Sequence, residues 1–404
     1  MSQIPRRHGR TRTITCGFVP LTDCATLVIA HELGFAQEEG VNLVLERELS
    51  WSSIRDKLAV GLFDAAHTLA PMPVAMGLGL SRMPADVVVP FMLSANGNLI
   101  VVSARLGANA APQPVFSTDA FAAANRLAAC KPGDAPLRIG VPWQRSMHAL
   151  LVQFWLERCG WREGVDHVLT IVPPPMMSDA MAAGEIDLCC VGEPWGSVAI
   201  DKGIGQLLLS ATSIWAFAPE KALAVRKNVV EQRGAVIESL VRGLFRAAAW
   251  LAKPENHGPA AELLARPEYV GQPAELIDRT LSHLAVIGPS GVPQRLGGGV
   301  ELFDGAATFP WRSHANWIAT RMLGEASDPH AQSLAQSQAK ARAEAVFRPD
   351  IYRNCLEALG VDLPAASAKL EGALATRSSV ASTLGTLSIG PDAFFDGSIF
   401  EPKI

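Results

Sequence analysis

ITCGFVPLTDCATLVIAHELGFAQEEGVNLVLERELSWSSIRDKLAVGLFDAAHTLAP, the stretch from Ile14 to Pro71, decides the fold class of this chain. A β-type run over residues 13–18 precedes an apolar helix that breaks at Gly34, and a second strand follows over residues 41–45. A second helix begins after Ser50, and a third strand follows it. Strands that alternate with helices in this way form a parallel sheet covered by helices on both faces.

Ligands of such sheets lie beyond the carboxyl ends of the strands, where the N-termini of helices point. In this stretch those positions are occupied by Thr22, Asp23, Ser50 and Trp51. We therefore expect a ligand site near these residues.

The same order of elements returns in the middle of the chain. A strand is predicted over residues 137–141, a helix that Ser146 caps over residues 147–159, and further strands over residues 167–172 and 186–191. A chain of 404 residues is also too long for one small core. The repetition predicts an α/β protein with two similar lobes.

The lobes are predicted to share the chain unequally, with two crossings between them. We assign residues 1–12 to a flexible N-terminus, residues 13–100 plus 213–404 to lobe I, and residues 101–212 to lobe II. Residues 228–284, 311–323 and 350–359 have helical patterns. We expect these C-terminal helices to pack back on lobe I.

Composition excludes several classes of protein. Apolar residues make up 49% and charged residues 18% of the chain, as in folded globular proteins, and the net charge of -4 provides no general attraction to nucleic acid or anionic membranes. The basic N-terminus is not followed by the apolar segment of a signal peptide, and no run approaches the length of a membrane span. We expect a cytoplasmic protein.

Motifs for catalysis and metal binding are missing from the sequence. No phosphate-binding loop of the GxxxxGK[ST] type and no GxSxG elbow occur, and Phe35 stands where the HExxH pattern needs histidine. The seven cysteines form no CxxC pair, so we expect them to be reduced and mostly buried. The absence of a nucleophile with its base favours a binding protein over an enzyme.

Donors at predicted helix starts stand out instead. Trp51, His148 and Gly192 begin or precede helices, and Lys221 adds a full positive charge. Free backbone N–H groups and the helix dipole make such starts suitable for an anion. Each residue has an ordinary alternative: core packing for Trp51, a structural histidine at 148, a tight turn at Gly192 and a solvated surface lysine at 221.

Longer blocks of sequence carry a family resemblance over nearly the whole chain. The blocks GFVPLTDCATLVIAHELGF, SWSSIRDKLAVGLFDAAHTL, CCVGEPWGSVAIDKGIG, PEKAL, FPWRSHANW, FRPDIYRNCLEALG and FFDGSIFEP occur in this order. They resemble the nitrate- and bicarbonate-binding proteins of ABC uptake systems, the NrtA/CmpA family. The resemblance implies a two-lobed, type II periplasmic-binding-protein-like α/β fold that clamps its ligand between the lobes.

The resemblance also implies which residues bind the ligand. The nitrate-binding positions of the family match Trp51, Asn98, His148, Gly192 and Lys221, with Asn98 in place of a glutamine that is longer by one methylene. Bicarbonate-binding members depend on a carboxylate-rich site with calcium, whereas Lys221 favours a metal-free, monovalent planar anion. We expect nitrate or nitrite, held without a cofactor or metal by a lone ammonium and uncharged N–H groups from both lobes.

Three functions remain open at this point. The resemblance without an export signal favours the cytoplasmic nitrate/nitrite sensor branch (NasS-like), whose partner is an ANTAR-domain RNA-binding antiterminator (NasT-like) that is released on ligand binding. The alternative is the substrate-binding subunit of a nitrate ABC importer, and a third is an enzyme on the same fold with His148 as base. The loop over residues 288–299 and the C-terminal helices are the candidate partner surface.

Overall fold

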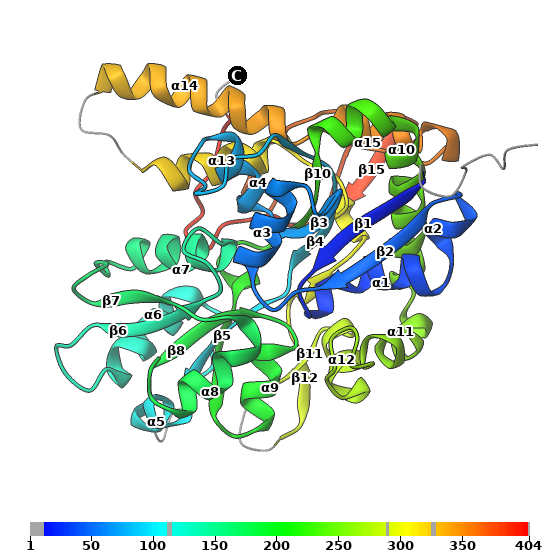
Figure 1. Ribbon diagram of the computed structural model, residues 1–404. Coiled ribbons are helices and arrows are strands. Elements are labelled where there is room, and N and C mark those ends of the chain that lie inside the picture. The colour runs from blue at the N-terminus through cyan, green and yellow to red at the C-terminus, as the bar shows by residue number, and fades with distance from the viewer. Residues whose placement is uncertain (1–11, 111–114, 288–290, 325–328, 403–404) are drawn as a thin grey trace, which may run out of the picture.

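The computed structural model describes residues 12–110, 115–287, 291–324 and 329–402, and Figure 1 shows two lobes built on separate sheets. The predicted α/β class and the two-lobed arrangement are confirmed. Of the predicted flexible N-terminus only Arg12 is described, and its guanidinium donates to the carbonyl of Gly40 at 2.5 Å. Among the helices in these ranges, none is both long and apolar enough to cross a membrane.

Lobe I contains a six-stranded sheet. In spatial order its strands are β13 (Val300–Glu301), β4 (Val87–Asn96), β10 (Pro219–Arg226), β3 (Ala65–Leu69), β1 (Thr13–Phe18) and β2 (Asn42–Arg47). Its first helices are α1 (Ala25–Glu32), α2 (Phe35–Glu38), α3 (Trp51–Val60) and α4 (Pro71–Gly77), and a 3-10 turn, η1 (Thr22–Cys24), follows β1. Strand β1 pairs in parallel with β2 and β3, as the sequence predicts, whereas β10 runs antiparallel between β3 and β4.

Lobe II contains a five-stranded sheet. In spatial order its strands are β7 (His167–Ile171), β6 (Leu137–Val141), β8 (Leu188–Gly192), β5 (Asn98–Ser103) and β9 (Gly205–Ser210). Its helices are α5 (Ala104–Gly107), α6 (Ala120–Cys130), α7 (Met147–Arg158), α8 (Met177–Ala182) and α9 (Trp195–Asp201), with 3-10 turns η2 (Ala108–Ala110), η3 (Pro174–Met176) and η4 (Ala211–Ser213). Strand β6 is parallel to β7 and β8, and β5 is antiparallel to β8 and β9.

The first crossing between the lobes is a sharp turn between β4 and β5. Asn96 has a φ of 59° and Gly97 a φ of 88°, so two consecutive residues adopt the left-handed conformation that asparagine and glycine tolerate best. A Cβ on Gly97 would also lie 2.6 Å from Val300 Cγ2. The sequence placed this boundary at residues 100/101, but the whole of β5 from Asn98 belongs to the lobe II sheet.

The second crossing runs from β9 through η4 into β10, close to the predicted boundary at 212/213. Strand β10, which the sequence analysis did not predict, returns the chain to the middle of the lobe I sheet. Because β10 is a central strand, Glu220 and Lys221 near its start are buried between the two sheets and do not lie at the surface.

The C-terminal part packs largely on lobe I and also contacts α7 and α9 of lobe II (Figure 1). Its helices are α10 (Lys227–Leu251), α11 (His257–Leu264), α12 (Ala274–Leu281), α13 (Arg312–Leu323), α14 (Pro329–Val346) and α15 (Pro349–Leu356), with 3-10 turns η5 (Pro254–Asn256), η6 (Asp304–Ala306) and η7 (Glu357–Leu359). Two hairpins add β11 (Leu284–Val286) with β12 (Pro293–Arg295) and β14 (Ser378–Ala381) with β15 (Thr386–Ile389). The predicted helical pattern over 228–284 is divided at Pro254 and Pro273, because proline lacks the N–H that a helix interior needs.

Candidate ligand-binding site

Local sequence places the five predicted ligand residues at the ends of elements that meet between the two sheets. Trp51 begins α3, which is capped by the Ser50 hydroxyl accepting from Ser53 N–H at 3.2 Å. His148 lies in the first turn of α7, where Ser146 accepts from Ala149 N–H at 3.1 Å. Such caps contribute about 1 kcal/mol each and fix where the helix, and with it the side chain, begins.

The remaining three residues lie on strands of both lobes. Asn98 opens β5 and is paired in register with Gly192 at the end of β8. Lys221 lies on β10 of lobe I. The structure thus brings all five positions together in one enclosed cluster: Trp51 is 1%, Asn98 2%, His148 1% and Lys221 0% exposed.

The ammonium of Lys221 does not stand alone, which corrects the expectation from the sequence. Lys221 Nζ lies 2.7 Å from Asp23 Oδ2 and 2.7 Å from Glu220 Oε1. Burial lowers the pKa of Lys221, but the two carboxylates outweigh it and hold that pKa above its ordinary value. The lysine is therefore charged. The two acids offset the high cost of burying an ammonium group, and any bound anion would share the charge of Lys221 with them.

Asp23 is supported by a histidine on the neighbouring strand. His67 Nε2 lies 3.1 Å from Asp23 Oδ1, and His67 Nδ1 accepts the N–H of Val19 at 3.5 Å, which assigns the ring proton to Nε2. Burial raises the pKa of Asp23, but Lys221 and His67 together lower it to about 2. Burial also lowers the pKa of His67, so this pair is an ionised aspartate beside a neutral imidazole at neutral pH.

Glu220 joins the two lobes at the centre of the cluster. Asn98 Nδ2 of lobe II donates to Glu220 Oε2 at 2.6 Å, and His148 Nδ1 lies 3.4 Å from Glu220 Oε1. Burial raises the pKa of Glu220 above its ordinary value, with Lys221 acting in the opposite direction. The amide of Asn98, predicted as a ligand donor, is thus committed to Glu220 in this structure.

Several buried polar atoms of the cluster have no hydrogen-bond partner within the described residues. They are Trp51 Nε1, His148 Nδ1 and Nε2, and Asn98 Oδ1, together with the facing atoms Asp23 Oδ1 and His67 Nε2. A buried group left without a partner costs about 1–3 kcal/mol, so such atoms call for an explanation. These atoms are concentrated around one charged lysine, an arrangement that suits a small polar ligand.

Gly192 leaves the space that these atoms surround. A Cβ at this position would lie 2.7 Å from Leu21 Cδ2, 3.4 Å from Asn98 Oδ1 and 3.7 Å from His148 Nε2. Any side chain here would therefore enter the region between the amide and the imidazole. The Trp51 ring centroid lies 5.6 Å from Lys221 Nζ, and His67 packs edge-on against this ring at 5.4 Å.

A metal centre has no support among the residues that the structure describes. No group of three or more histidine, cysteine, aspartate or glutamate side chains there is arranged to hold a metal ion. The two acids of the cluster, Asp23 and Glu220, both contact Lys221, and an ammonium between them repels a cation.

Sequence reasoning missed Asp23 as a charge partner, together with His67 and Glu220. Asp23 was placed correctly beyond the end of the first strand, but nothing in the pattern linked it to a lysine 198 positions later in the numbering. Glu220 is adjacent to Lys221, and neighbours on a strand ordinarily point to opposite faces. A register shift between β10 and β4 at Lys221 accompanies this departure, and it was not readable from the sequence.

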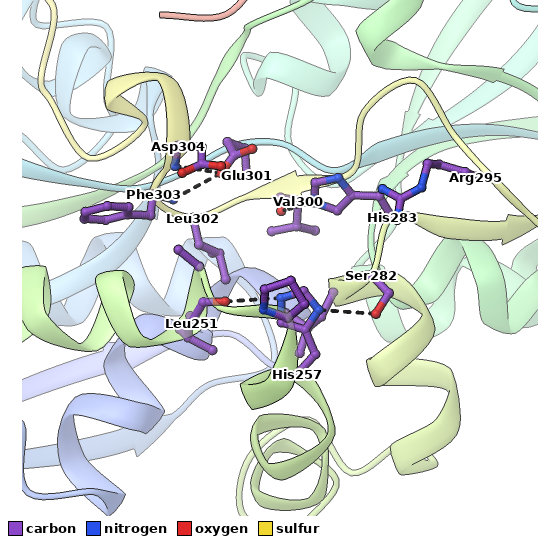
Figure 2. Close-up of a pocket in the computed structure, with 13 residues that line it drawn as sticks. Leu251, His257, Ser282, His283, Arg295, Val300, Glu301, Leu302, Phe303 and Asp304 are labelled. Carbon is purple, nitrogen blue, oxygen red and sulfur yellow. Dashed lines mark hydrogen bonds between the residues drawn. The ribbon is translucent and has the colours of Figure 1, made fainter. Parts of the chain in front are cut away.

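A separate cavity of about 260 Å³ lies beside the end of α10, α12 and β13, and Figure 2 shows its lining residues. None of the cluster residues lines it. Its histidine His257 already has partners for both ring nitrogens, since Nδ1 lies 3.2 Å from Ser282 Oγ and Nε2 lies 3.2 Å from the carbonyl of Leu251 (Figure 2). This cavity lacks the unpartnered donors that distinguish the cluster.

Comparison with known proteins agrees with the fold and with the resemblance read from the sequence. The chain is 27% identical over 398 residues to the nitrate/nitrite binding protein NrtA of Nostoc sp. (strain PCC 7120), covering 96% of this chain and 82% of that protein. It is 35% identical over 236 residues to the nitrate import ATP-binding protein NrtC of Synechocystis sp. (strain PCC 6803), covering 58% of this chain and 34% of that protein.

Among solved structures, the periplasmic nitrate-binding protein NrtA from Synechocystis PCC 6803 superimposes with a TM-score of 0.82 at 25% identity, covering 98% of this chain and 96% of that one. The shared fold therefore includes the C-terminal helices as well as both lobes. Residues 7–265 match the NMT1-like family, and because this match spans more than half of the chain, the protein belongs to the NMT1-like family.

Proposed function

We propose that this protein binds nitrate or nitrite in the buried cluster between its lobes. The observation that carries the proposal is the set of unpartnered donors, Trp51 Nε1 and His148, around the ammonium of Lys221. Nitrate and nitrite offer only acceptor oxygens, which such donors satisfy. The similarity to proteins named as nitrate or nitrite binders supports the same ligand.

The arrangement also provides a reason for the lobes to close on the ligand. Trp51 and Lys221 come from lobe I, whereas Asn98, His148 and Gly192 come from lobe II. A ligand that contacts both sets stabilises the closed state relative to the open one by its differential interaction energy. Binding and closure are then coupled, as expected for a protein that delivers its ligand to a partner or whose closed conformation a partner recognises.

The better-supported role is that of the substrate-binding subunit of a nitrate or nitrite ABC importer. Relatives are named for nitrate/nitrite binding and for nitrate import, and they align over most or much of this chain. Contacts from two lobes suit transport, because opening of the lobes releases the anion to the membrane subunits.

The second role is a cytoplasmic sensor that holds an ANTAR-domain RNA-binding antiterminator (NasT-like) until the anion arrives. Its support is the resemblance read from the sequence, so it ranks below the importer. By linkage, a partner released by the anion must weaken anion binding by the same factor. A pull-down from cell extract distinguishes the roles: a small RNA-binding protein recovered only without nitrate supports the sensor, and importer subunits support transport.

The ligand assignment is tested by Trp51→Phe. This change removes one N–H and keeps an aromatic ring in the core, so we expect nitrate affinity to fall by about 10- to 100-fold, the effect of losing one hydrogen bond of about 1.5–3 kcal/mol to a charged group. Isothermal titration calorimetry measures it. Trp311→Phe is the matched control, because Trp311 Nε1 is also buried without a partner among the described residues but lies outside the cluster.

Two results would contradict the assignment. Unchanged nitrate affinity in Trp51→Phe would place the ligand elsewhere. Heat released by bicarbonate with calcium, but not by nitrate or nitrite, would indicate a different ligand for the same fold.

A further inference from the structure

Glu220 and Asn98 form a hydrogen-bonded pair that spans the two lobes at the centre of the cluster. Asn98 Nδ2 lies 2.6 Å from Glu220 Oε2, and the other carboxylate oxygen, Oε1, lies 2.7 Å from Lys221 Nζ. Both side chains are buried, at 0% exposed for Glu220 and 2% for Asn98.

The remaining polar atom of this pair, Asn98 Oδ1, faces the space beside Gly192 (the ligand space) and is an acceptor, which does not suit an anion. Asn98 Oδ1 has no partner within the described residues and would lie 3.4 Å from a Cβ on Gly192. A carbonyl oxygen is an acceptor, and nitrate brings only acceptors. With Asp23 and Glu220 both ionised, one ammonium also faces two carboxylates, so the cluster is negative before any anion enters.

One proton removes both obstacles. A protonated Glu220 donates its O–H to Asn98 Oδ1, which requires the amide of Asn98 to turn by half a rotation and exchange its oxygen and nitrogen. The NH₂ group then faces the ligand space as a donor. The separation of 2.6 Å is shorter than the usual N–H···O distance of about 2.9–3.0 Å and suits an O–H···O contact of about 2.7 Å.

We propose that Glu220 takes up one proton from solvent when the anion binds, and that Asn98 turns its amide at the same time to donate to the anion. The proposal rests on the anion-binding function above and deepens it. The carboxylate becomes a carboxylic acid, the O–H replaces an N–H in the bond between the two side chains, and no redox step is involved. Glu220 is thereby a positioning residue, because it acts on the anion through the orientation of Asn98.

Other titratable groups face Glu220 from every surrounding element. They are Lys221 on β10, Asp23 on η1, His67 on β3, His148 on α7 and Cys190 on β8. Burial holds the pKa of Cys190 well above its ordinary value, so it remains a thiol. Burial, with help from Lys221, holds the pKa of His148 well below its ordinary value, so the imidazole is neutral at neutral pH.

The pKa of Glu220 is shifted in the opposite direction. Burial raises its pKa, Lys221 lowers it, and Asp23 raises it further, with a net upward direction. A bound anion adds a second negative charge nearby and raises it again. Because the complex binds the proton more tightly than the free protein does, anion affinity must increase as the pH falls, by up to about tenfold per pH unit between the two pKa values.

The test is a nitrate titration of the intact protein by calorimetry from about pH 6 to about pH 9, with two buffers of different ionisation enthalpy at each pH. We expect uptake of close to one proton per nitrate and an affinity that weakens with rising pH. In Glu220→Gln the amide reproduces the protonated acid, since its oxygen accepts from Lys221 and its NH₂ donates to Asn98 Oδ1. This variant should bind nitrate with no proton uptake and no dependence on pH over that range.

The exposed Glu185→Gln is the matched control and should keep both the proton uptake and the pH dependence. Nitrate binding without proton uptake by the unaltered protein would overturn the inference while leaving the anion-binding function intact. The same pH dependence in Glu220→Gln would also overturn it and would move the proton to His148. No nitrate binding at any pH would instead refute the anion-binding function itself.

Discussion

At the residue scale, the site depends on what surrounds one charged amine. The family resemblance supplied Lys221 and its polar neighbours, and the structure places these together. The acids Asp23 and Glu220 were not anticipated as its partners. A buried charge in a protein needs opposite charges or hydrogen-bond partners beside it, and here those partners come from elements distant in sequence.

Glycine 192 provides a prediction at this scale. In Gly192→Ala the new methyl group would lie 2.7 Å from Leu21 Cδ2 and would point between Asn98 and His148. Leu21 can shift because the contact is with the end of its side chain, so we expect a folded protein that has lost at least about tenfold in nitrate affinity, or ~1.4 kcal/mol. Calorimetry measures the affinity, and the melting temperature checks the fold.

Gly234→Ala serves as the control, since a Cβ at Gly234 meets nothing within 4 Å and lies on a helix, where alanine is the better helix former. Full nitrate affinity in Gly192→Ala would show that the space beside this glycine is not where the anion binds.

At the element scale, the C-terminal segment is held by a second buried charge cluster. The backbones of Glu371 and Phe400 exchange hydrogen bonds of 3.0 and 2.8 Å, Ser313 Oγ donates to Glu371 Oε1 at 2.5 Å, and Lys369 contacts both Glu371 and Asp392. These contacts join α13 to the chain after α15. Helix α14 and the β14–β15 hairpin in this region were not predicted, because their patterns carry little apolar periodicity.

Glu371 makes the stability of this segment dependent on pH. Burial raises its pKa, but His314 and Lys369 bring it down from an ordinary value of 4.5 to about 2. Because the folded value is the lower one, the stabilisation is present above about pH 5 and is lost as the pH falls toward 2. We expect Glu371→Gln to lower the free energy of unfolding at pH 7 by about 3 kcal/mol, and by about half that or less at pH 3.

Chemical denaturation at both pH values measures this difference, with the exposed Glu357→Gln as the control. An equal loss of stability at pH 7 and pH 3 would mean that packing, and not the charge of Glu371, stabilises the segment.

At the scale of the whole molecule, contacts across the lobes hold the cluster closed. Thr22 N–H donates to the carbonyl of Glu193 at 2.9 Å, and Trp195 Nε1 of α9 donates to the carbonyl of Pro20 at 2.8 Å. These two bonds connect the chain after β1 to the chain after β8, and the Asn98–Glu220 bond connects β5 to β10. They exclude solvent from the site, so the anion must enter while the lobes are apart.

Trp195→Phe tests this closure. The change removes one hydrogen bond between the lobes and no contact with the cluster, so we expect nitrate affinity to fall by about fivefold, the equivalent of ~1 kcal/mol, through faster dissociation. Stopped-flow tryptophan fluorescence follows the dissociation rate. Trp161→Phe, within lobe II and partly buried, is the control; an unchanged rate in Trp195→Phe would show that this bond does not restrain opening.

The sequence by itself determined the α/β class, the two lobes and the starts of the helices that carry Trp51 and His148, because strand and helix periodicity and the capping serines at 50 and 146 are local signals. Only the tertiary structure decided that Asp23, His67 and Glu220 share the charge of Lys221, and that β10 returns to the lobe I sheet. The reason is physical: backbone geometry is set by neighbouring residues, whereas the charge state of a buried group is set by whatever the fold brings within a few ångströms of it.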